Sequence, residues 1–316
     1  MSDGAPTPNA ALAAAAAKRV TGRAPVEMRR FPTGVAHYVY EALLENGDAV
    51  VVRMGYRRQR DSLQAGLLLA QKLRPLGVPL PKILADGLDD PCPWIAMERL
   101  PGKDLGEAID SLLTSQLQDV ARRVADAQQA ASRVGTAGRY GYAAVPDAAP
   151  HAKWSAVLDE NITRARGRIA STGSFDLEIV DTATSLVETL RSELDAQPAT
   201  PFLHDTTTRN VIIAPQGVLS GIVDVDDLCF GDPRYPAALT LAALLGVGGP
   251  TSYVEAWLSA AGQADDRLFR LYVAIFLLDL MSEDGLVFNG NERPREPSAR
   301  AALLNAFREN VALVSA

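Results

Sequence analysis

Residues 203–233 constrain the fold more than any other stretch, because they read as two short strands joined by a tight turn. The segments 211–213 and 218–223 are apolar and rich in β-branched residues, and residues 214–217 between them carry the proline and glycine typical of turns. We therefore expect a β-hairpin, whose two outer ends lie side by side.

Oxygen-bearing side chains stand at the open end of this expected hairpin. Asn210 precedes the first strand, Asp224 follows the second, and Asp205 lies in a threonine-rich loop before Asn210. Carboxylate and amide oxygens are the hard ligands that Mg²⁺ takes when it also holds phosphate, and a further aspartate can accept a proton. The pattern favours a site for phosphoryl transfer.

Three motifs follow one another here: Asp205-x4-Asn210, then Gly221-Ile222-Val223-Asp224, then Phe230-Gly231-Asp232-Pro233. Their order and spacing resemble the catalytic and metal-binding segments of the aminoglycoside phosphotransferase family, whose members share the protein-kinase-like fold. The resemblance implies that Asp205 is the catalytic base and that Asn210 and Asp224 are the metal ligands.

Two positions depart from the family pattern. The family commonly has His and then Gly before the Asp, whereas Leu203 and His204 precede Asp205 here. After Gly-Asp-Pro the family usually places an Asp at the start of the next helix, and that place is held by Pro236. Both positions support the catalytic loop, so they bear on its geometry more than on the type of reaction.

An N-terminal sheet is predicted by the Asn46-Gly47 step, which joins two apolar runs and is a strong hairpin signal. In the family the first strand carries a loop over the nucleotide phosphates, and residues 33–37 occupy that place. The resemblance therefore assigns Gly34 and His37 to the nucleotide site. With a single glycine, the segment taken alone reads as an ordinary turn.

Arg53 ends a valine-rich strand, where a buried cation needs a partner. Kinase-like folds usually have a lysine there that pairs with the nucleotide phosphates, and the resemblance gives that role to Arg53. A solvated arginine at a strand end is the alternative. Residues 61–74 are predicted to form an amphipathic helix. The fold usually carries a glutamate on this helix to orient the cation, but only Asp61 and Gln64 are available.

A strand ending at Glu98 and followed by Pro101-Gly102 resembles the family's hinge, where backbone groups bind adenine. Position alone assigns Glu98 and Leu100 to the nucleotide site. The Pro-Gly pair also predicts the boundary between two lobes. Residues 1–101 would then form a nucleotide-binding lobe, and residues 102–316 a catalytic and substrate-binding lobe.

Helical spacing dominates beyond residue 101, and residues 135–150 read as a loop. A short helix is also expected near the N-terminus. The chain is therefore assigned to the α+β class, as a bilobal protein-kinase-like fold. Its N-terminal lobe has an antiparallel sheet plus helix, and its larger C-terminal lobe is mostly helical and carries the catalytic hairpin. Helices are predicted over residues 114–134, 154–171, 177–194, 235–245, 251–262, 267–281 and 299–314.

Composition argues against several classes of function. A net charge of −7 disfavours nucleic acid as a partner, because phosphate binding needs a basic surface. Cys92 and Cys229 lie far apart, which indicates neither a disulfide framework nor a zinc cluster and fits a reducing compartment. No stretch has the length of a membrane span, and the alanine-rich N-terminus lacks the basic region of a signal peptide. We expect a cytoplasmic protein without membrane or nucleic-acid partners.

The resemblance implies a reaction that moves the γ-phosphate of ATP or GTP to a hydroxyl of a small molecule, with Mg²⁺ as cofactor. An aminoglycoside or another antibiotic is the first candidate acceptor, since the acidic balance of the chain suits a cationic substrate. The side chains that would face such a cation are Asp226, Asp227, Asp279 and Glu283. A solvated acidic surface is the alternative for all four, and binding of a second metal ion is a further alternative for Asp226 and Asp227.

Three other functions remain open. A metabolic kinase acting on choline, homoserine or a sugar would use the same fold, because fold does not fix substrate. A nucleotide-binding pseudokinase would account for the missing helix glutamate and for Pro236. The apolar strand before Asp224 and Asp226 also resembles the aspartyl-nucleophile motif of haloacid-dehalogenase-type phosphatases, although that motif normally leads into a parallel sheet.

Overall fold

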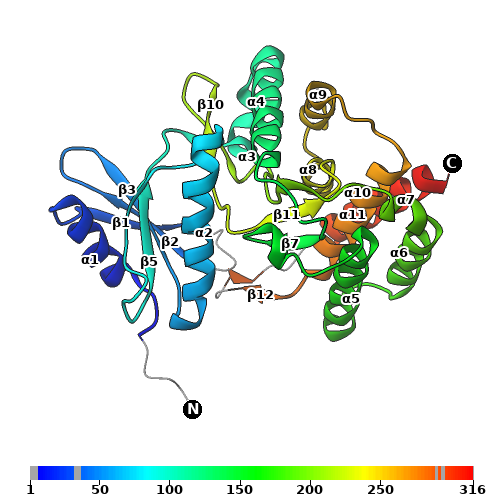
Figure 1. The fold of residues 1–316 in the computed structure, drawn as a ribbon, viewed down its shortest axis with the longest axis horizontal. Helices are drawn as coiled ribbons and strands as arrows, with labels where there is room; N and C mark the ends of the chain where they lie inside the picture. The colour runs from blue at the N-terminus through cyan, green and yellow to red at the C-terminus, as the bar shows by residue number, and fades with distance from the viewer. Residues whose placement is uncertain (1–5, 32–36, 289–290, 293–295, 316) are drawn as a thin grey trace.

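A computed structural model describes residues 6–31, 37–288, 291–292 and 296–315 of the chain. Figure 1 shows two parts side by side: a sheet with flanking helices formed by the first third of the chain, and a mostly helical remainder. All strand pairs among the described residues are antiparallel. The α+β assignment is thus confirmed, and the described residues lack the parallel sheet that the phosphatase alternative requires.

The N-terminal sheet has five strands in the order β1-β2-β3-β5-β4. The predicted hairpin at Asn46-Gly47 joins β2 to β3, and Gly47 takes the left-handed backbone conformation (φ 85°) that this turn needs. Helices α1 and α2 cover opposite faces of the sheet (Figure 1). The elements are α1 (Ala10–Thr21), β1 (Glu27–Phe31), β2 (Tyr38–Leu43), β3 (Ala49–Met54), α2 (Arg60–Leu73), β4 (Ile83–Asp86) and β5 (Trp94–Glu98).

Strand β1 was not expected from the sequence. It pairs with β2 at the edge of the sheet, and three of its five side chains are exposed, so it lacks the apolar alternation that marks a half-buried strand. The predicted lobe boundary near residue 101 falls between β5 and the next strand, β6 (Lys103–Asp104).

The predicted catalytic hairpin is formed by β9 (Val211–Ile213) and β10 (Leu219–Ile222), with Ile213 opposite Leu219 and Val211 opposite Ile222. Strand β6 adds a third member, in the order β10-β9-β6. Gly217, with φ 78°, closes the turn between the two strands. The hairpin is therefore confirmed, and it is held to the segment that follows the predicted hinge.

A second three-stranded sheet, β7-β11-β8, was missed. It comprises β7 (Gly141–Ala143), which lies inside the predicted loop 135–150, β8 (Thr200–Leu203) and β11 (Leu228–Gly231). All four residues of β11 are buried, so its strand carries no alternation, and β7 is too short to show a period. This sheet anchors both ends of the segment that contains the catalytic loop.

The expected helix over residues 177–194 is two helices, α6 (Glu178–Thr189) and α7 (Arg191–Asp195), which break at Leu190. Leu190 has φ −101° and ψ 10°, values outside the helical region, and α6 therefore ends there. The other helices match their predicted positions within a few residues or are short additions. They are α3 (Leu105–Ala108), α4 (Thr114–Ser132), α5 (Trp154–Thr172), α8 (Tyr235–Val247), α9 (Ser252–Ala261), α10 (Arg267–Ser282) and α11 (Pro297–Ser315).

The largest core surrounds α10, which is buried on nearly every side and packs against α5, α8 and α11. Trp154, at the start of α5, is fully buried there and its Nε1 donates to the hydroxyl of Tyr272. The short strands β12 (Val287–Phe288) and β13 (Asn291–Glu292) form a small hairpin before α11. Within the described ranges no helix combines the length and hydrophobicity of a bilayer span.

Candidate active site

The loop between β8 and β9 fixes Asp205 by local hydrogen bonds. Oδ1 of Asp205 accepts from the backbone N–H of Thr207 at 3.3 Å and from the Thr207 hydroxyl at 2.8 Å. Asn210 Nδ2 donates to the Asp205 carbonyl at 3.1 Å. Two residues proposed from the sequence are therefore joined directly, and Oδ2 is left as the carboxylate oxygen of Asp205 that can accept a proton.

The hairpin brings Asp224 to the same place. The Val223 N–H donates to the Asn210 carbonyl at 2.9 Å, so the residue after Val223 begins beside Asn210. Asp224 has φ 63° and is the only residue other than glycine with positive φ in the described part of the chain. Such a conformation costs free energy and persists where the surroundings impose it, which is typical of functional sites.

The oxygens of this group suit a magnesium ion bound together with phosphates. Asn210 commits Nδ2 to the backbone, which leaves Oδ1 for a cation, and the Asp224 carboxylate is half exposed. Mg²⁺ is usually held by one or two protein oxygens plus phosphates rather than by a protein cage. No cluster of three or more acidic, histidine or cysteine ligands occurs among the described residues.

Arg53, at the end of β3, is buried and contacts both carboxylates of the Asp224–Asp226 segment. Its Nη1 donates to Asp226 Oδ1 at 2.5 Å, its Nη2 donates to Asp226 Oδ2, and Nη2 lies 2.9 Å from Asp224 Oδ1. The solvated strand-end alternative is thus wrong. Arg53 reaches across to the open end of the hairpin formed by β9 and β10, and its nucleotide role stays a prediction.

His37 packs behind Arg53, and its Nδ1 lies 2.7 Å from Arg53 Nη2. Arginine only donates, so His37 Nδ1 is the acceptor and the proton of the neutral ring is on Nε2. Burial, with the nearby Arg53 charge, lowers the pKa of His37 from 6.5 to about 3. His37 therefore supports the arginine as a neutral ring. Gly34, the other residue assigned to this loop, lies outside the described residues.

The predicted hinge residues have structural contacts of their own. Glu98 Oε1 accepts from the Lys82 N–H at 2.7 Å, and the Glu98 N–H donates to the Lys82 carbonyl at 2.9 Å. Leu100 is buried against the hairpin, since a Cβ added at Gly221 would lie 2.7 Å from Leu100 Cδ1. The assignment of Glu98 and Leu100 to a nucleotide site stays a prediction.

Support for the catalytic loop comes from two residues that sequence analysis did not single out. Gln128 on α4 donates from Nε2 to the Leu203 carbonyl and to the Thr206 hydroxyl, both at 3.0 Å, and accepts from the Leu203 N–H at 2.9 Å. Thr240 on α8 reaches the Thr206 carbonyl at 3.4 Å. The Gln128 contacts hold the loop to α4, and the Thr240 contact holds it to α8, where Pro236 stands in place of the family's aspartate. The sequence feature that could have indicated the role of Gln128 is its position among the apolar residues of one face of α4.

His204 sits among aromatic rings. Its ring centroid lies 4.7 Å from that of Tyr142 and 6.2 Å from those of Tyr235 and Phe276. Desolvation among these rings lowers the pKa of His204 below its ordinary value, which favours the neutral ring. The displaced histidine therefore packs as an aromatic residue beneath the catalytic loop.

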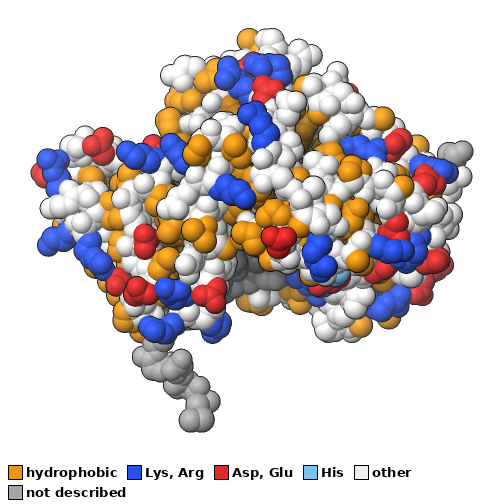
Figure 2. Space-filling model, in the orientation of Figure 1, with side chains coloured by type: hydrophobic (Ala, Val, Ile, Leu, Met, Phe, Trp, Pro, Cys, Tyr) orange, Lys and Arg blue, Asp and Glu red, His pale blue; other side chains and the backbone are white. Residues whose placement is uncertain are grey.

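The four acidic residues proposed to face a cationic substrate have different surroundings. Asp226 is held by Arg53, and Asp279 on α10 pairs with Arg164 at 3.2 Å and with Arg168 at 3.4 Å, both on α5. Asp227 is exposed and Glu283 is half buried. On the face drawn in Figure 2, acidic and basic side chains are interspersed. The acidic wall stays a prediction, and two of its four carboxylates already have arginine partners.

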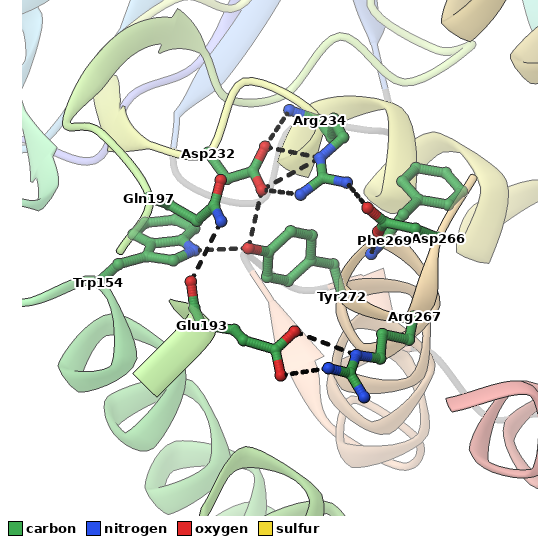
Figure 3. Close-up of polar contacts among 9 residues, drawn as sticks. All are labelled: Trp154, Glu193, Gln197, Asp232, Arg234, Asp266, Arg267, Phe269 and Tyr272. Atoms are coloured by element: carbon green, nitrogen blue, oxygen red, sulfur yellow. Dashed lines mark hydrogen bonds and ion pairs between the residues drawn. The ribbon is translucent and has the colours of Figure 1, made fainter. Parts of the chain in front are cut away.

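Asp232, in the segment after β11, belongs to a separate buried network (Figure 3). Its carboxylate accepts from the Arg234 backbone and guanidinium, and from the Tyr272 hydroxyl at 3.0 Å. Arg234 Nη1 also donates to Asp266 at 2.6 Å, and Asp266 caps α10 by accepting from the Phe269 N–H. This network ties the end of the catalytic segment to the central helix.

A catalytic loop, an adjoining hairpin with a metal-type aspartate and an arginine reaching over from an antiparallel sheet define a kinase-like phosphotransferase. The model of the phosphotransferase enzyme family matches residues 27–272, and the chain belongs to that family. The expected relationship to the aminoglycoside phosphotransferases is confirmed. No curated protein matches the chain in sequence.

Solved structures share the fold over nearly the whole chain. Aminoglycoside phosphotransferase APH(2'')-Ib, bound to ADP, aligns with a TM-score of 0.65 at 14% identity, covering 97% of this chain and 99% of that one. A mutant of aminoglycoside 2'-phosphotransferase IIIa in its GDP complex gives 0.65 at 18%, with 97% and 96% covered. A putative fructosamine-3-kinase from Thermobifida fusca gives 0.61 at 18%, with 95% and 98% covered. The protein-kinase-like fold is confirmed.

Proposed function

We propose that this phosphotransferase moves the γ-phosphate of ATP or GTP to a hydroxyl group of a small molecule. The observation that carries the proposal is the hydrogen-bonded path from Asp205 through Asn210 to Val223, which gathers a base and two metal-type oxygens at one end of the hairpin. Arg53 lies at the same end, ion-paired with Asp224. Similar structures bound to ADP and to GDP share this fold, which supports the proposal of a purine nucleotide as co-substrate.

Asp205 is assigned the role of base. Thr207 fixes its Oδ1 by two hydrogen bonds, so Oδ2 would take the proton of the acceptor hydroxyl as that oxygen attacks the γ-phosphorus. The bond from the γ-phosphorus to the β–γ bridging oxygen would break, and ADP or GDP would leave with that oxygen. Because the base is already oriented, the activation free energy does not include the entropic cost of ordering its side chain. The proton then resides on Asp205 until it is lost to solvent.

Asn210 and Asp224 would hold Mg²⁺, which when bound would supply positive charge that neutralises the nucleotide phosphates. Arg53, whose own side chain is 11% exposed, would add a permanent positive charge on the same side. We also propose the division into two lobes near residue 101, with the adenine or guanine base at the linker that includes Glu98 and Leu100. A cytoplasmic location, where nucleoside triphosphates are made, fits the two free cysteines.

For the acceptor, an aminoglycoside or another amine-bearing antibiotic is the first candidate, in line with the names of two similar structures. Antibiotic resistance would then be its physiological role. A metabolic alcohol or sugar is the second. Arg164 and Arg168 offset Asp279, which lowers the negative charge available to a polycation, and a putative fructosamine-3-kinase shares the fold.

The decisive experiment is a coupled assay of ADP or GDP release, run over a panel of aminoglycosides, other antibiotics, amino alcohols and sugars. With an acceptor found, Asp205→Asn should lower kcat by about 10²–10⁴, the contribution of a general base. The matched control is Asp61→Asn, because the Asp61 side chain is 96% exposed on α2. Full turnover by Asp205→Asn would exclude this residue as the base.

A second measurement separates the enzyme from a pseudokinase. Thermal unfolding with and without ATP, GTP and Mg²⁺ reports nucleotide binding, since a ligand that binds only the folded state raises Tm. A shift with nucleotide but no turnover on any acceptor would favour the pseudokinase. Turnover that is lost on adding a chelator and restored by Mg²⁺ supports the enzyme.

A further inference from the structure

Helix α2 does not supply the acid that kinase-like folds use to orient the cation of β3. Its two candidates, Asp61 and Gln64, both contact Arg60 instead: Asp61 at 3.7 Å, and Gln64 by accepting from Arg60 Nη1 at 2.9 Å. Asp61 is exposed at the first turn of the helix. The orienting carboxylate must therefore come from another part of the chain.

We propose that Asp226 is the positioning residue for Arg53, in place of an acid on helix α2. Both oxygens of its carboxylate accept from the two terminal nitrogens of the guanidinium, which is the planar, two-point contact that holds an arginine in one orientation. Asp226 is only partly exposed, so the ion pair is less screened than a surface pair. The proposal rests on the proposed function, in which Arg53 meets the nucleotide phosphates.

Gly66 supplies an independent observation. A Cβ built on this glycine would lie 2.9 Å from Asp226 Oδ1 and 3.5 Å from the Val225 carbonyl oxygen. Glycine in the middle of a helix costs roughly 1 kcal/mol relative to alanine, so a helix that carries one here gives up stability. The missing side chain leaves room on α2 for the Asp226 carboxylate.

Asp226 and Gly66 thus act together in orienting Arg53: one supplies the carboxylate and the other leaves space for it. The carboxylate that kinase-like folds extend from the helix toward the strand cation here extends from the segment after β10, and it meets α2 at Gly66. His37 Nδ1 accepts from Nη2 of the same guanidinium, so Arg53 is held from two sides before any nucleotide arrives. A preorganised cation binds phosphate without the entropic cost of ordering its own side chain.

The experiment moves the carboxylate from the loop to the helix. Asp226→Ala should raise the KM for the nucleoside triphosphate and the Kd for ADP by roughly tenfold to a hundredfold, with a smaller change in kcat. Adding Gly66→Asp to Asp226→Ala should recover most of that loss. Aspartate is the matching length, because its oxygens lie one carbon beyond Cβ and the gap from Cβ to the vacated position is 2.9 Å.

The test is whether Gly66→Asp weakens or strengthens nucleotide binding, because the direction of its effect should depend on whether Asp226 is present. In the otherwise natural chain Gly66→Asp should weaken nucleotide binding, since it brings a second carboxylate against Asp226, whereas in the Asp226→Ala background it should strengthen it. A general packing role for Asp226 predicts no such inversion. Asp61→Ala is the matched control on α2 and should leave KM and Kd unchanged. The free energy of unfolding is measured for every variant.

Two results overturn the proposal. One is an unchanged nucleotide KM and Kd in Asp226→Ala, and the other is a folded double variant that recovers no affinity. If Asp226→Ala does not fold, the isosteric Asp226→Asn is used, and an unchanged Kd for ADP in that variant has the same consequence. Because ADP binding is measured without turnover, failure here is distinct from failure of the proposed reaction, which Asp205→Asn tests.

Discussion

Arg53 and Arg234 each hold two aspartates near the catalytic segment, but the two clusters are built differently. Arg234 and Asp232 are buried, with side chains 10% and 2% exposed, and Asp232 is saturated by donors from Arg234 and Tyr272 (Figure 3). Around Arg53 the Asp224 side chain is 52% exposed and carries positive φ. The second partner of Arg234, Asp266, is 46% exposed but caps α10. Asp232, a buried carboxylate with its acceptors satisfied, stabilises the fold, while Asp224, an exposed carboxylate on a residue with positive φ, is available to a ligand.

The strongest test of this contrast removes the buried carboxylate. Asp232→Ala should lower the free energy of unfolding by about 3–5 kcal/mol, because it leaves the buried Arg234 guanidinium with Asp266 alone and the Tyr272 hydroxyl without its acceptor. Urea unfolding at pH 7 measures the change. A loss comparable to that of a surface ion pair, under about 1 kcal/mol, would contradict the structural role.

The exposed cluster should give the opposite result. Asp224→Asn is expected to reduce kcat/KM by about 10²–10³, because it removes the charged member of the proposed Mg²⁺ ligand pair and so weakens the positive charge that would stabilise the reacting phosphate. The unfolding free energy should hardly change, since asparagine tolerates positive φ and Arg53 keeps Asp226 as a partner. Steady-state kinetics and urea unfolding on the same preparation separate the two effects. A stability loss as large as that of Asp232→Ala would remove the distinction between the clusters.

The smallest predicted effect is a pH dependence from His37. Its pKa is about 3 in the folded chain and 6.5 when unfolded, so below pH 6.5 the unfolded chain binds a proton that the folded chain does not. Stability should therefore fall as the pH drops toward 3, by roughly 2 kcal/mol between pH 7 and pH 5 from this group. His37→Gln keeps an acceptor for Arg53 but has no ring to titrate. Its loss of stability between pH 7 and pH 5 should therefore be smaller than that of the natural protein by roughly 2 kcal/mol. Equal losses in both proteins would show that His37 does not titrate in this way.

Local patterns predicted much of the fold and the centre of the site. The hairpin followed from β-branched runs around Pro215 and Gly217, and its geometry alone required Asn210 and Asp224 to meet. Most helices followed from apolar spacing. What failed was short or uniformly buried, such as β7 and β11, where no period exists to be read.

Long-range partners were not predictable in the same way. Arg53 and Asp226 are 173 residues apart, and Gln128 lies 75 residues from Leu203, so nothing in the neighbourhood of either residue indicates the contact. Asp226 was interpreted as a substrate-facing acid because only its chain neighbours were visible. Gly66 likewise reads as a weak spot in a helix until the carboxylate beside it is known.

The lack of an orienting acid on α2, where Gly66 instead faces Asp226, also bears on how nucleotide binding could be regulated. In protein kinases the position of this helix controls activity, because the strand cation is oriented only when the helix glutamate is in place. Here neither Arg53 nor Asp226 is on α2, although Asp226 packs against Gly66 of that helix. If Asp226 is the positioning residue, the orientation of Arg53 would depend on the segment after β10 rather than on an acid carried by α2.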